Sequence, residues 1–471
     1  MFDLTSLPKV ALLIFVVVMS FNIIIFVHEL GHFWAAKWRG LQIDRFQIWF
    51  GKPIWSKTVN GVQYGLGWIP AGGFVALPQM APMESIEGGT KPDQPLPPIT
   101  PLDKIIVAFA GPLFSFLLAL LAATVVWKIG KPKDFVPETR IGYVAPASPA
   151  EKAGMLPGDT VIAINGKPVK GFAGSLNSIT EQVILSRGKE IVFTVARPGV
   201  AEPFKLTSGF ETEKTQWFQR RGMRQVGLMP SSPAIVGSTS LNSPAADAGL
   251  VKGDRIVSVD GTRIYGPEQF SLYLKNRNWQ TVLVGVENAS GQTREVSLTP
   301  EKPLQPANST PKIGVLWENT KEVDTRIVHP GPIQQVKESL HSMWITITSV
   351  IAPDSNIGVD HLSGPVGIAK MQYQLLQTEN GMQRIIAFFV LFNVNLAVLN
   401  MLPFPVLDGG HITLALLEKI SGRPVKAKPL EIIQTVCALG LISLMLFVTS
   451  KDIGDSFGGG SAEKNVEVVF P

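Results

Sequence analysis

The sequence predicts a polytopic α-helical membrane protein that carries two related α+β domains between its second and third spans. Of the 471 residues, 45% are hydrophobic and only 17% are charged, whereas about 25% of residues are charged in an ordinary soluble domain. Four apolar runs approach or exceed the ~20 residues that a helix needs to cross a bilayer core. One segment of the chain also recurs, without gaps, 95 positions later.

Each predicted span is set by an apolar run. The first (about 8–36) and the second (about 103–127) belong to a membrane part that covers residues 1–135. The third and fourth lie within residues 382–451. The first run lacks the basic start of a signal peptide, and His-Glu-Leu-Gly-His follows it where a small-residue cleavage site would stand. We therefore expect this run to be retained as a span.

Lysine and arginine gather in the two short loops, after the first span and after the third. Because cytoplasmic loops are enriched in these residues, both loops are expected on the cytoplasmic side. Both termini and the long segment between the second and third spans are then extracytoplasmic. The basic residues of the two loops are Lys37, Arg39, Arg45, Lys52, Lys57, Lys91, Lys104, Lys419, Arg423, Lys426 and Lys428.

The recurring segment reads SPAEKAGMLPGDTVIAINGKPV from Ser148 and SPAADAGLVKGDRIVSVDGTRI from Ser243. Each copy combines a short helical stretch, a Gly-Asp turn and a hairpin signal, Asn-Gly or Asp-Gly. A similar strand, QVGLMP or KIGVLW, follows each copy. This pattern resembles the PDZ domain of bacterial proteases and predicts two such domains, at 136–230 and 232–317. PDZ domains bind extended peptides at a sheet edge; the alternative is that the pair acts only as a spacer or steric screen.

Four further features limit the remaining possibilities. Residues 330–352 place apolar side chains at helical spacing and predict an amphipathic extracytoplasmic helix, either on the membrane surface or covering another helix. The tail, 458–471, has the composition of a flexible linker followed by a tag remnant and is left out of fold reasoning. Cys437 is the single cysteine, so no internal disulfide is expected. A net charge of +5 without a basic block gives no support for nucleic-acid binding.

The first apolar run ends in the sequence HELGH, which begins at His28. On a helix, residues four apart share a face, so His28 and His32 can hold one zinc ion while Glu29 reaches a water beside it. Zinc would acidify that water, and Glu29 would take its proton. The same five letters also occur by chance as a histidine pair on the surface of a soluble helix. Here they end a membrane span, where ionisable residues are functional by default, and this favours the metal site.

A catalytic zinc ion usually has three protein ligands and one open position. The segment NMLPFPVLDGGHITLALLEKI, from Asn400, follows the third span to the membrane face predicted for His28 and His32. Asp408 and His411 in this segment are rival third ligands. Asp408 precedes two glycines and an apolar run, which also makes it a good helix N-cap, and both roles could coexist.

HELGH at the end of the first span and NMLPFPVLDG beyond the third together resemble the two signatures of the site-2 protease family of intramembrane zinc metalloproteases. The resemblance covers nearly the whole chain. It implies that His28, His32 and Asp408 hold one zinc ion per chain, and that Glu29 is the catalytic acid/base.

The family also implies how a substrate is held. Asn400, Pro403 and Pro405 match positions that help to hold the substrate strand. YGLGWIPAGGFVALP, residues 64–78, matches a β-hairpin-like element that dips into the membrane beside the active site; the alternative is an ordinary glycine-rich loop. In FAGPLFSFLLAL, Ser115 stands where the second-span motif of the family has asparagine, and no role is assigned to this position.

The implied activity is hydrolysis of peptide bonds within the transmembrane segments of single-span proteins. For the family, the implied substrates are an anti-sigma factor already trimmed outside the membrane and remnant signal peptides, in an envelope stress response. The implied location is among the lipids of a bacterial inner membrane, with the PDZ domains in the periplasm and the active site toward the cytoplasm. Two other classes stay open: a non-catalytic membrane scaffold that recruits partners through PDZ domains, and a metal transporter.

Overall fold

The computed structural model describes residues 7–80, 99–305, 309–318, 323–423, 427–457 and 470. The chain divides into two compact units, which we name the membrane unit and the β unit. The membrane unit comprises Met1–Pro132, Ile327–Thr348 and Leu362–Ile453, and the β unit comprises Lys133–Arg326, Ser349–His361 and Gly454–Pro471. The predicted linker and tag remnant, 458–471, lies outside the described residues except for residue 470.

Seven helices in the described residues build the membrane unit or continue from it. They are α1 (Leu7–Arg39), α3 (Pro101–Ile129), α8 (Pro332–Ile351), α9 (Pro365–Gln377), α10 (Gly381–Asn400), α11 (Asp408–Ser421) and α12 (Ala427–Phe457). Four of them are long and apolar enough to cross a membrane, over Val10–Arg39, Pro101–Ile129, Gly381–Asn400 and Pro429–Phe457. The amphipathic α8 is not among these four.

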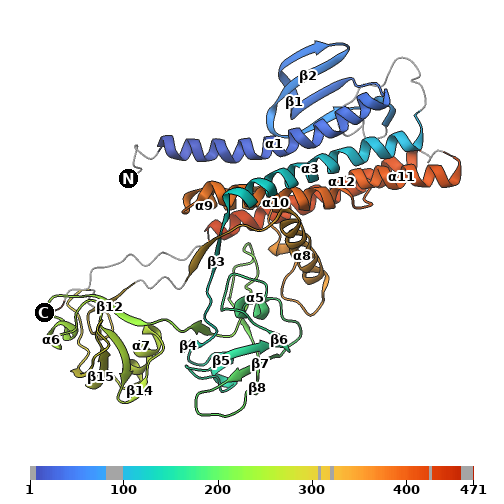
Figure 1. The fold of residues 1–471 in the computed structure, drawn as a ribbon. Helices are drawn as coiled ribbons and strands as arrows, with labels where there is room; N and C mark the ends of the chain where they lie inside the picture. Colours follow the sequence, from blue (N-terminus) through green and yellow to red (C-terminus); the bar gives the residue numbers. More distant parts are fainter. Residues whose placement is uncertain are drawn as a thin grey trace. The chain divides into compact units, whose positions relative to one another are not determined.

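Helix α3 is the centre of the membrane unit and packs against α1, α10 and α11 (Figure 1). The approach of α1 is close because Gly31 lacks a side chain: a Cβ there would lie 2.4 Å from the carbonyl oxygen of Ala110. Small residues allow such approaches between helices in lipid. At the start of α3, Lys104 Nζ lies 2.7 Å from Glu418 Oε2 of α11. This ion pair ties α11 to the α3 end nearest the HELGH segment.

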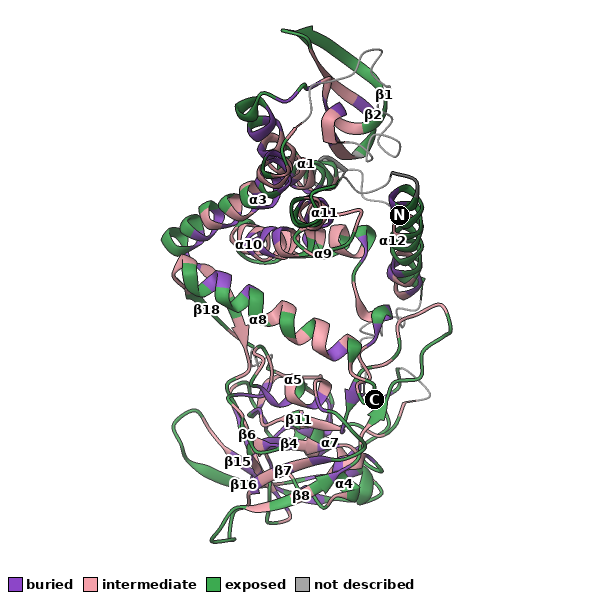
Figure 2. Cartoon of the chain, turned by 90° about the vertical axis from the view of Figure 1, so that its right-hand side faces the viewer, coloured by how far each residue is buried: buried purple, intermediate pink, exposed green. Residues whose placement is uncertain are grey.

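Helix α12 exposes most of its apolar side chains, and Figure 2 shows it largely green. An apolar helix surface of this kind suits contact with lipid. Near the end of α12, the buried Asp452 accepts hydrogen bonds from the backbone N–H of Gly364 (3.0 Å) and Gly367 (2.8 Å) at the start of α9. A Cβ on Gly367 would lie 2.3 Å from Asp452 Oδ1, so glycine is needed for this contact.

The loop after α1 forms a long antiparallel hairpin, β1 (Arg45–Val59) and β2 (Val62–Ala76), followed by the short 3₁₀ helix Pro78–Met80. Its turn, Asn60–Gly61, has positive φ at both residues, as a two-residue hairpin turn requires. The base of the hairpin joins a hydrophobic cluster with α1 and α3 that includes Phe33, Phe46, Val75, Leu77 and Val107. This packing places the end of β2 beside the HELGH turn of α1.

The β unit contains two domains of similar construction, which we name the first β domain (136–230) and the second β domain (232–317). The first has a four-stranded sheet in the order β6-β5-β7-β8 and a separate β11-β4 pair. Its elements are β4 (Ile141–Val144), α4 (Pro149–Lys152), β5 (Thr160–Ile164), β6 (Lys167–Pro168), α5 (Ile179–Ile184), β7 (Ile191–Ala196), β8 (Phe204–Ser208), β9 (Glu211–Thr212), β10 (Arg224–Gln225) and β11 (Leu228–Pro230).

The second β domain has one sheet in the order β16-β15-β13-β12-β17, with β14 paired to β13. Its elements are β12 (Ala234–Thr239), α6 (Pro244–Asp247), β13 (Arg255–Val259), β14 (Thr262–Arg263), α7 (Pro267–Asn276), β15 (Val282–Glu287), β16 (Thr293–Leu298) and β17 (Val315–Trp317). Two further strands, β3 (Lys131–Phe135) and β18 (Asp324–Val328), pair with each other outside both domains.

The sequence repeat is matched by a repeated ion pair. The Asp159 side chain is 1% exposed and lies 2.7 Å from Arg197 Nε, and the Asp254 side chain, also 1% exposed, lies 2.6 Å from Arg294 Nη2. Both aspartates come from the Gly-Asp turn of the repeat, and both arginines lie beyond it in the sequence. A buried carboxylate needs such a partner, and in both domains an arginine provides it.

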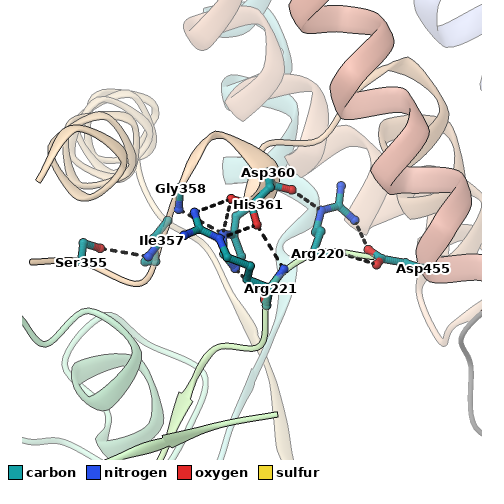
Figure 3. A network of polar contacts seen from close by, with 8 residues as sticks. All are labelled: Arg220, Arg221, Ser355, Ile357, Gly358, Asp360, His361 and Asp455. Carbon is teal, nitrogen blue, oxygen red and sulfur yellow. Dashed lines mark hydrogen bonds and ion pairs between the residues drawn. The ribbon is translucent and has the colours of Figure 1, made fainter. Parts of the chain in front are cut away.

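Within the β unit, the 3₁₀ helix Val359–His361 contacts arginines of the first β domain (Figure 3). Arg221 donates to both carboxylate oxygens of Asp360, at 2.7 and 3.0 Å, and His361 Nε2 donates to the Arg221 carbonyl at 2.9 Å. Arg220 pairs in turn with Asp455. Hydrogen bonding from Arg221 holds the pKa of Asp360 well below its usual range, so the carboxylate is ionised at neutral pH.

Candidate metal centre

Two imidazoles of α1 face each other across one helical turn. Their Nε2 atoms, on His28 and His32, lie 3.3 Å apart. This is the juxtaposition that the four-residue spacing predicts. Both side chains are nearly buried, at 12% and 13% exposed.

Asp408, the first residue of α11, completes the cluster. Its Oδ2 lies 3.3 Å from His28 Nε2, and its Oδ1 lies 3.3 Å from His32 Nε2. The N-cap of α11 is Leu407, not Asp408, so the N-cap alternative for Asp408 is wrong. Its carboxylate turns toward the histidines instead.

The polar atoms of this cluster are close enough together to hold one metal ion. One ligand atom from each of the three side chains lies within 4.8 Å of the other two. The nearest contacts between His28, His32 and Asp408 are each 3.3 Å, and the two histidines contact different oxygens of Asp408. Ligand atoms about 2.0–2.1 Å from a tetrahedral ion lie about 3.3 Å from one another. Within the described part of the chain, these three side chains form the group able to hold a metal ion, and His411 is not part of it. The residues present therefore fit zinc, with a fourth position left for another ligand.

Helix α3 fixes the orientation of both rings. The carbonyl oxygen of Val107 can only accept a hydrogen bond, so His32 Nδ1, 2.8 Å away, must carry the proton. The lone pair of His32 then lies on Nε2, which faces the cluster. His28 Nδ1 lies 3.0 Å from the hydroxyl of Ser115, which is fully buried. Partners of this kind set the tautomer and orientation of metal-binding histidines.

Gly111 of α3 provides the space that the histidines occupy. A Cβ on this residue would lie 2.2 Å from His32 Nε2 and 2.9 Å from His28 Nε2. The sequence alone assigns no role to Gly111, Ser115 or Val107, because a missing side chain, one hydroxyl and a backbone carbonyl carry no chemical signature. The available signal is the small-residue segment around Gly111, which resembles a second-span motif of the site-2 protease family.

We predict that Gly111→Ala weakens zinc binding by at least about tenfold, the lower end of the 10–100-fold range seen when a group supporting metal ligands is lost. The added methyl group must displace one or both imidazoles, because it would overlap the ring atoms that face the cluster. Zinc content after dialysis against a graded chelator series measures the change.

Gly440→Ala is the matched control for this change. Gly440 also lies in a candidate span, but a Cβ there meets no atom within 4 Å. Its zinc affinity should equal that of the unaltered chain. Equal zinc affinity of both variants would contradict the role of Gly111.

The cluster opens into a cavity of about 190 Å³. Glu29 lines this cavity together with the three cluster residues, as do Asn400 at the end of α10 and His411 of α11. Val75 and Leu77, from the end of the β-hairpin and just beyond it, form part of the wall. The cavity thus brings a metal-binding cluster, a free carboxyl group and the end of a strand into one space.

Charge in the cavity is centred on Asp408. Burial tends to raise the pKa of Asp408, but the imidazoles of His32 and His28 more than offset it and hold that pKa below its usual range. Burial lowers the pKa of His411. The Asp408 carboxylate is therefore ionised at neutral pH.

The two proline positions do not line the cavity. Pro403 and Pro405 lie in the turn between α10 and α11, which folds back onto the start of α11. A Cβ on Gly409 would lie 2.3 Å from the Met401 carbonyl oxygen, and one on Gly410 would lie 2.1 Å from that of Phe404. The two glycines after Asp408 allow the chain to pass this close to the preceding turn. The turn leaves the Asp408 side chain facing the histidines of α1.

Comparison with known proteins identifies the family of this chain. The model of peptidase family M50 matches residues 15–446. The chain belongs to this family. The resemblance to site-2 proteases seen in the sequence is thereby confirmed.

Curated relatives of the family resemble this chain over most of their length. The regulator of sigma-E protease RseP of Salmonella typhimurium is 27% identical over 460 residues, which cover 91% of this chain and 95% of the relative. The Escherichia coli protein of the same name is 28% identical over 459 residues, with the same coverage. A protein of Neisseria meningitidis described as a zinc metalloprotease is 28% identical over 443 residues, covering 90% and 95%.

Among solved structures, a PDZ domain from Listeria monocytogenes covers 21% of this chain and 98% of its own length. It is 21% identical, with a TM-score of 0.17. That score is too low to support an argument about the β domains.

Proposed function

We propose that this M50 peptidase is an intramembrane zinc metalloendopeptidase that cuts the transmembrane segments of single-span proteins. The observation that carries the proposal is the cluster of His28, His32 and Asp408, with 3.3 Å contacts between its members, at the end of an apolar helix. A scaffold has no need for such a cluster. A transporter needs successive metal sites, and no second cluster occurs within the described residues.

Different residues of the site bind the metal, transfer the proton and orient the imidazoles. His28, His32 and Asp408 hold one zinc ion, which when bound supplies Lewis acidity and lowers the pKa of water. Glu29 takes a proton from the attacking water and delivers it to the amine nitrogen that leaves. The Val107 carbonyl and the Ser115 hydroxyl hold the two imidazoles in position during the reaction.

The substrate must be extended before it can be cut, because every amide of a membrane helix is hydrogen-bonded internally. The end of β2, with Val75 and Leu77 in the cavity wall, offers backbone groups along which an extended strand can pair. Asn400 also lines the cavity and offers a side-chain partner for the same strand. Pro403 and Pro405, in the turn between α10 and α11, are proposed to help hold that strand, since the turn continues into the cavity-lining residues Val406 and Leu407.

The proposed substrates are a pre-trimmed anti-sigma factor and remnant signal peptides, in an envelope stress response. The names of the relatives support the regulatory role, since two of them are regulators of sigma-E. The proposed location is the bacterial inner membrane, with both termini and both β domains in the periplasm. The lysines and arginines of the two short loops support this orientation. We propose that the β domains are PDZ domains that screen substrates.

The test is cleavage of a purified single-span protein that lacks its outer domain, with the whole chain in detergent or liposomes. We expect about one zinc ion per chain, cleavage products whose new ends map within the span by mass spectrometry, loss of cleavage on removing zinc with a chelator, and recovery on adding it back. Binding of the substrate without any cut, in a zinc-loaded preparation, would contradict the protease and favour the scaffold.

A further inference from the structure

The first β domain carries an ordered loop, residues 213–223, between β9 and β10. The ends of the loop are held together because these two strands pair with each other. Near its middle, the backbone N–H of Gln219 donates to the Gln216 carbonyl at 2.9 Å, and the Gln216 N–H donates to the side-chain oxygen of Gln219 at 2.8 Å. This is the hydrogen bonding of a β-turn, and it places Trp217 and Phe218 at the two central positions of the turn.

Trp217 is highly exposed at this turn. Its ring contacts that of Phe218 edge to face, with 5.8 Å between the centroids, yet Trp217 as a whole is 88% exposed. Burial of a tryptophan removes about 150–250 Å² from water, so the folded chain leaves a large stabilising contribution unused at this position. A tryptophan presented by an ordered turn is therefore a candidate contact residue, and its surroundings indicate the partner.

The same loop is attached to the last turn of α12, Gly454–Phe457, which belongs to the β unit. The backbone N–H of Arg220 donates to Asp455 Oδ1 at 3.0 Å, and the Arg220 guanidinium pairs with the other carboxylate oxygen (Figure 3). A Cβ on Gly454 would lie 2.2 Å from the Phe218 carbonyl oxygen, so the backbones of the loop and the helix are in close contact. The turn that carries Trp217 therefore lies against the end of a candidate membrane span.

The position of Asp455 along α12 indicates its depth relative to a bilayer. Residues 432–450 of the candidate span contain no charged side chain, and Lys451 is the first charged residue after them. Asp455 follows Lys451 by one helical turn, which is about 6 Å of helix rise. The headgroup layer outside the hydrocarbon core is about 5–8 Å thick on each side. When α12 spans a bilayer, Asp455 and the attached turn therefore lie at the level of the headgroups.

The chemistry of the exposed side chains near this attachment suits that layer. Tryptophan is enriched at membrane–water interfaces, where its apolar ring and its polar N–H are both accommodated. Phe457, two residues after Asp455, is 81% exposed. Lys214, on the same loop as Trp217, is also exposed and carries a positive charge that attracts lipid phosphate groups. An apolar ring with a basic neighbour at headgroup depth fits a lipid surface.

We propose that the loop 213–223 is a membrane anchor of the first β domain, with Trp217 inserted among the headgroups of the leaflet in which α12 ends. The partner is the phospholipid surface itself. Trp217 supplies the contact with lipid, and the pairing of Arg220 with Asp455 holds the loop at the required level. The anchor depends on α12 spanning a bilayer but not on proteolysis, and its tests measure no cleavage.

A fluorescent label beside Trp217 tests the insertion. Cys437→Ser removes the natural thiol, and Gln216→Cys then takes a nitrobenzoxadiazole label, since the turn uses only the backbone of Gln216. The full-length chain is placed in vesicles of phosphatidylethanolamine and phosphatidylglycerol. We expect a blue-shifted emission that phospholipids brominated near the headgroup quench, and both effects should be lost on adding Trp217→Ser.

Leu241→Ser is the matched control, because Leu241 of the second β domain is also 88% exposed. On the same labelled background it should leave the emission and the quenching unchanged. Quenching that is equal with and without Trp217, or that Leu241→Ser removes as well, would overturn the proposal.

Photo-crosslinking identifies the partner directly. Benzoylphenylalanine in place of Trp217 keeps a large aromatic side chain at the turn, and the full-length chain is again placed in the same vesicles, with a single-span membrane protein added. Irradiation should give a peptide containing residue 217 that is heavier by the mass of one phospholipid, as read by mass spectrometry. Adducts to the added protein or to a second copy of this chain, without any lipid adduct, would overturn the proposal and assign Trp217 to a protein interface.

Discussion

Glu29→Gln is expected to reduce cleavage of a single-span substrate by about 10²–10⁴-fold, the range that a positioned acid/base contributes. Glutamine keeps the size and hydrogen-bonding capacity of the side chain but cannot take up a proton at neutral pH. Glu29 lines the metal cavity without belonging to the ligand cluster. Zinc content should therefore stay at about one ion per chain, which separates lost chemistry from lost metal. Single-turnover cleavage and metal analysis of the same preparation measure both.

Glu431→Gln is the matched control, because Glu431 is exposed on α12 and is not part of the cavity. It should cleave like the unaltered chain. Equal processing by Glu29→Gln and the unaltered chain would remove Glu29 from the chemistry and bring the scaffold hypothesis forward.

Asp408→Ala is expected to remove most of the bound zinc and, with it, all cleavage. The variant removes the carboxylate whose two oxygens each lie 3.3 Å from an imidazole, and it leaves only the two imidazoles of the cluster. The loss of zinc affinity should exceed the 10–100-fold that follows from losing a group outside the ligand set. Zinc titration of the metal-free protein, followed by assay with added zinc, measures the loss.

His411→Ala provides the comparison that decides between the two candidate ligands. His411 lines the same cavity but stands outside the ligand cluster, so its removal should leave zinc stoichiometry unchanged. If His411→Ala loses zinc while Asp408→Ala retains it, the assignment of the third ligand is wrong.

Several features of this protein follow from local sequence patterns. The HELGH spacing places two imidazoles on one helix face wherever a helix forms, and apolar runs of sufficient length specify the four candidate spans. The repeat likewise specifies its own buried aspartate at Asp159 and Asp254, because each Gly-Asp turn carries it. Such features depend on residues close together in the chain, so a linear reading captures them.

The third ligand could not be chosen in this way. Asp408 and His411 are both metal-binding residue types, only three positions apart, and Asp408 lies 376 positions after His32. Helix α11 packs on α3, and the tight turn before it leaves Asp408, not His411, facing the histidines. The choice depends on a rotation of one helix that no local pattern encodes.

The supporting groups depended on tertiary structure even more strongly. Gly111 of α3 matters because a side chain there would overlap the histidines. Val107 contributes a backbone carbonyl to His32, and Ser115 of α3 contributes a hydroxyl to His28 of α1. The sequence by itself determined the spans, the repeat and the pair of histidines with their glutamate, because helical period and turn chemistry are local. Only the packing of α3 between α1 and α11 decided which distant groups complete the metal site, since contact between helices is set by the shapes of whole surfaces.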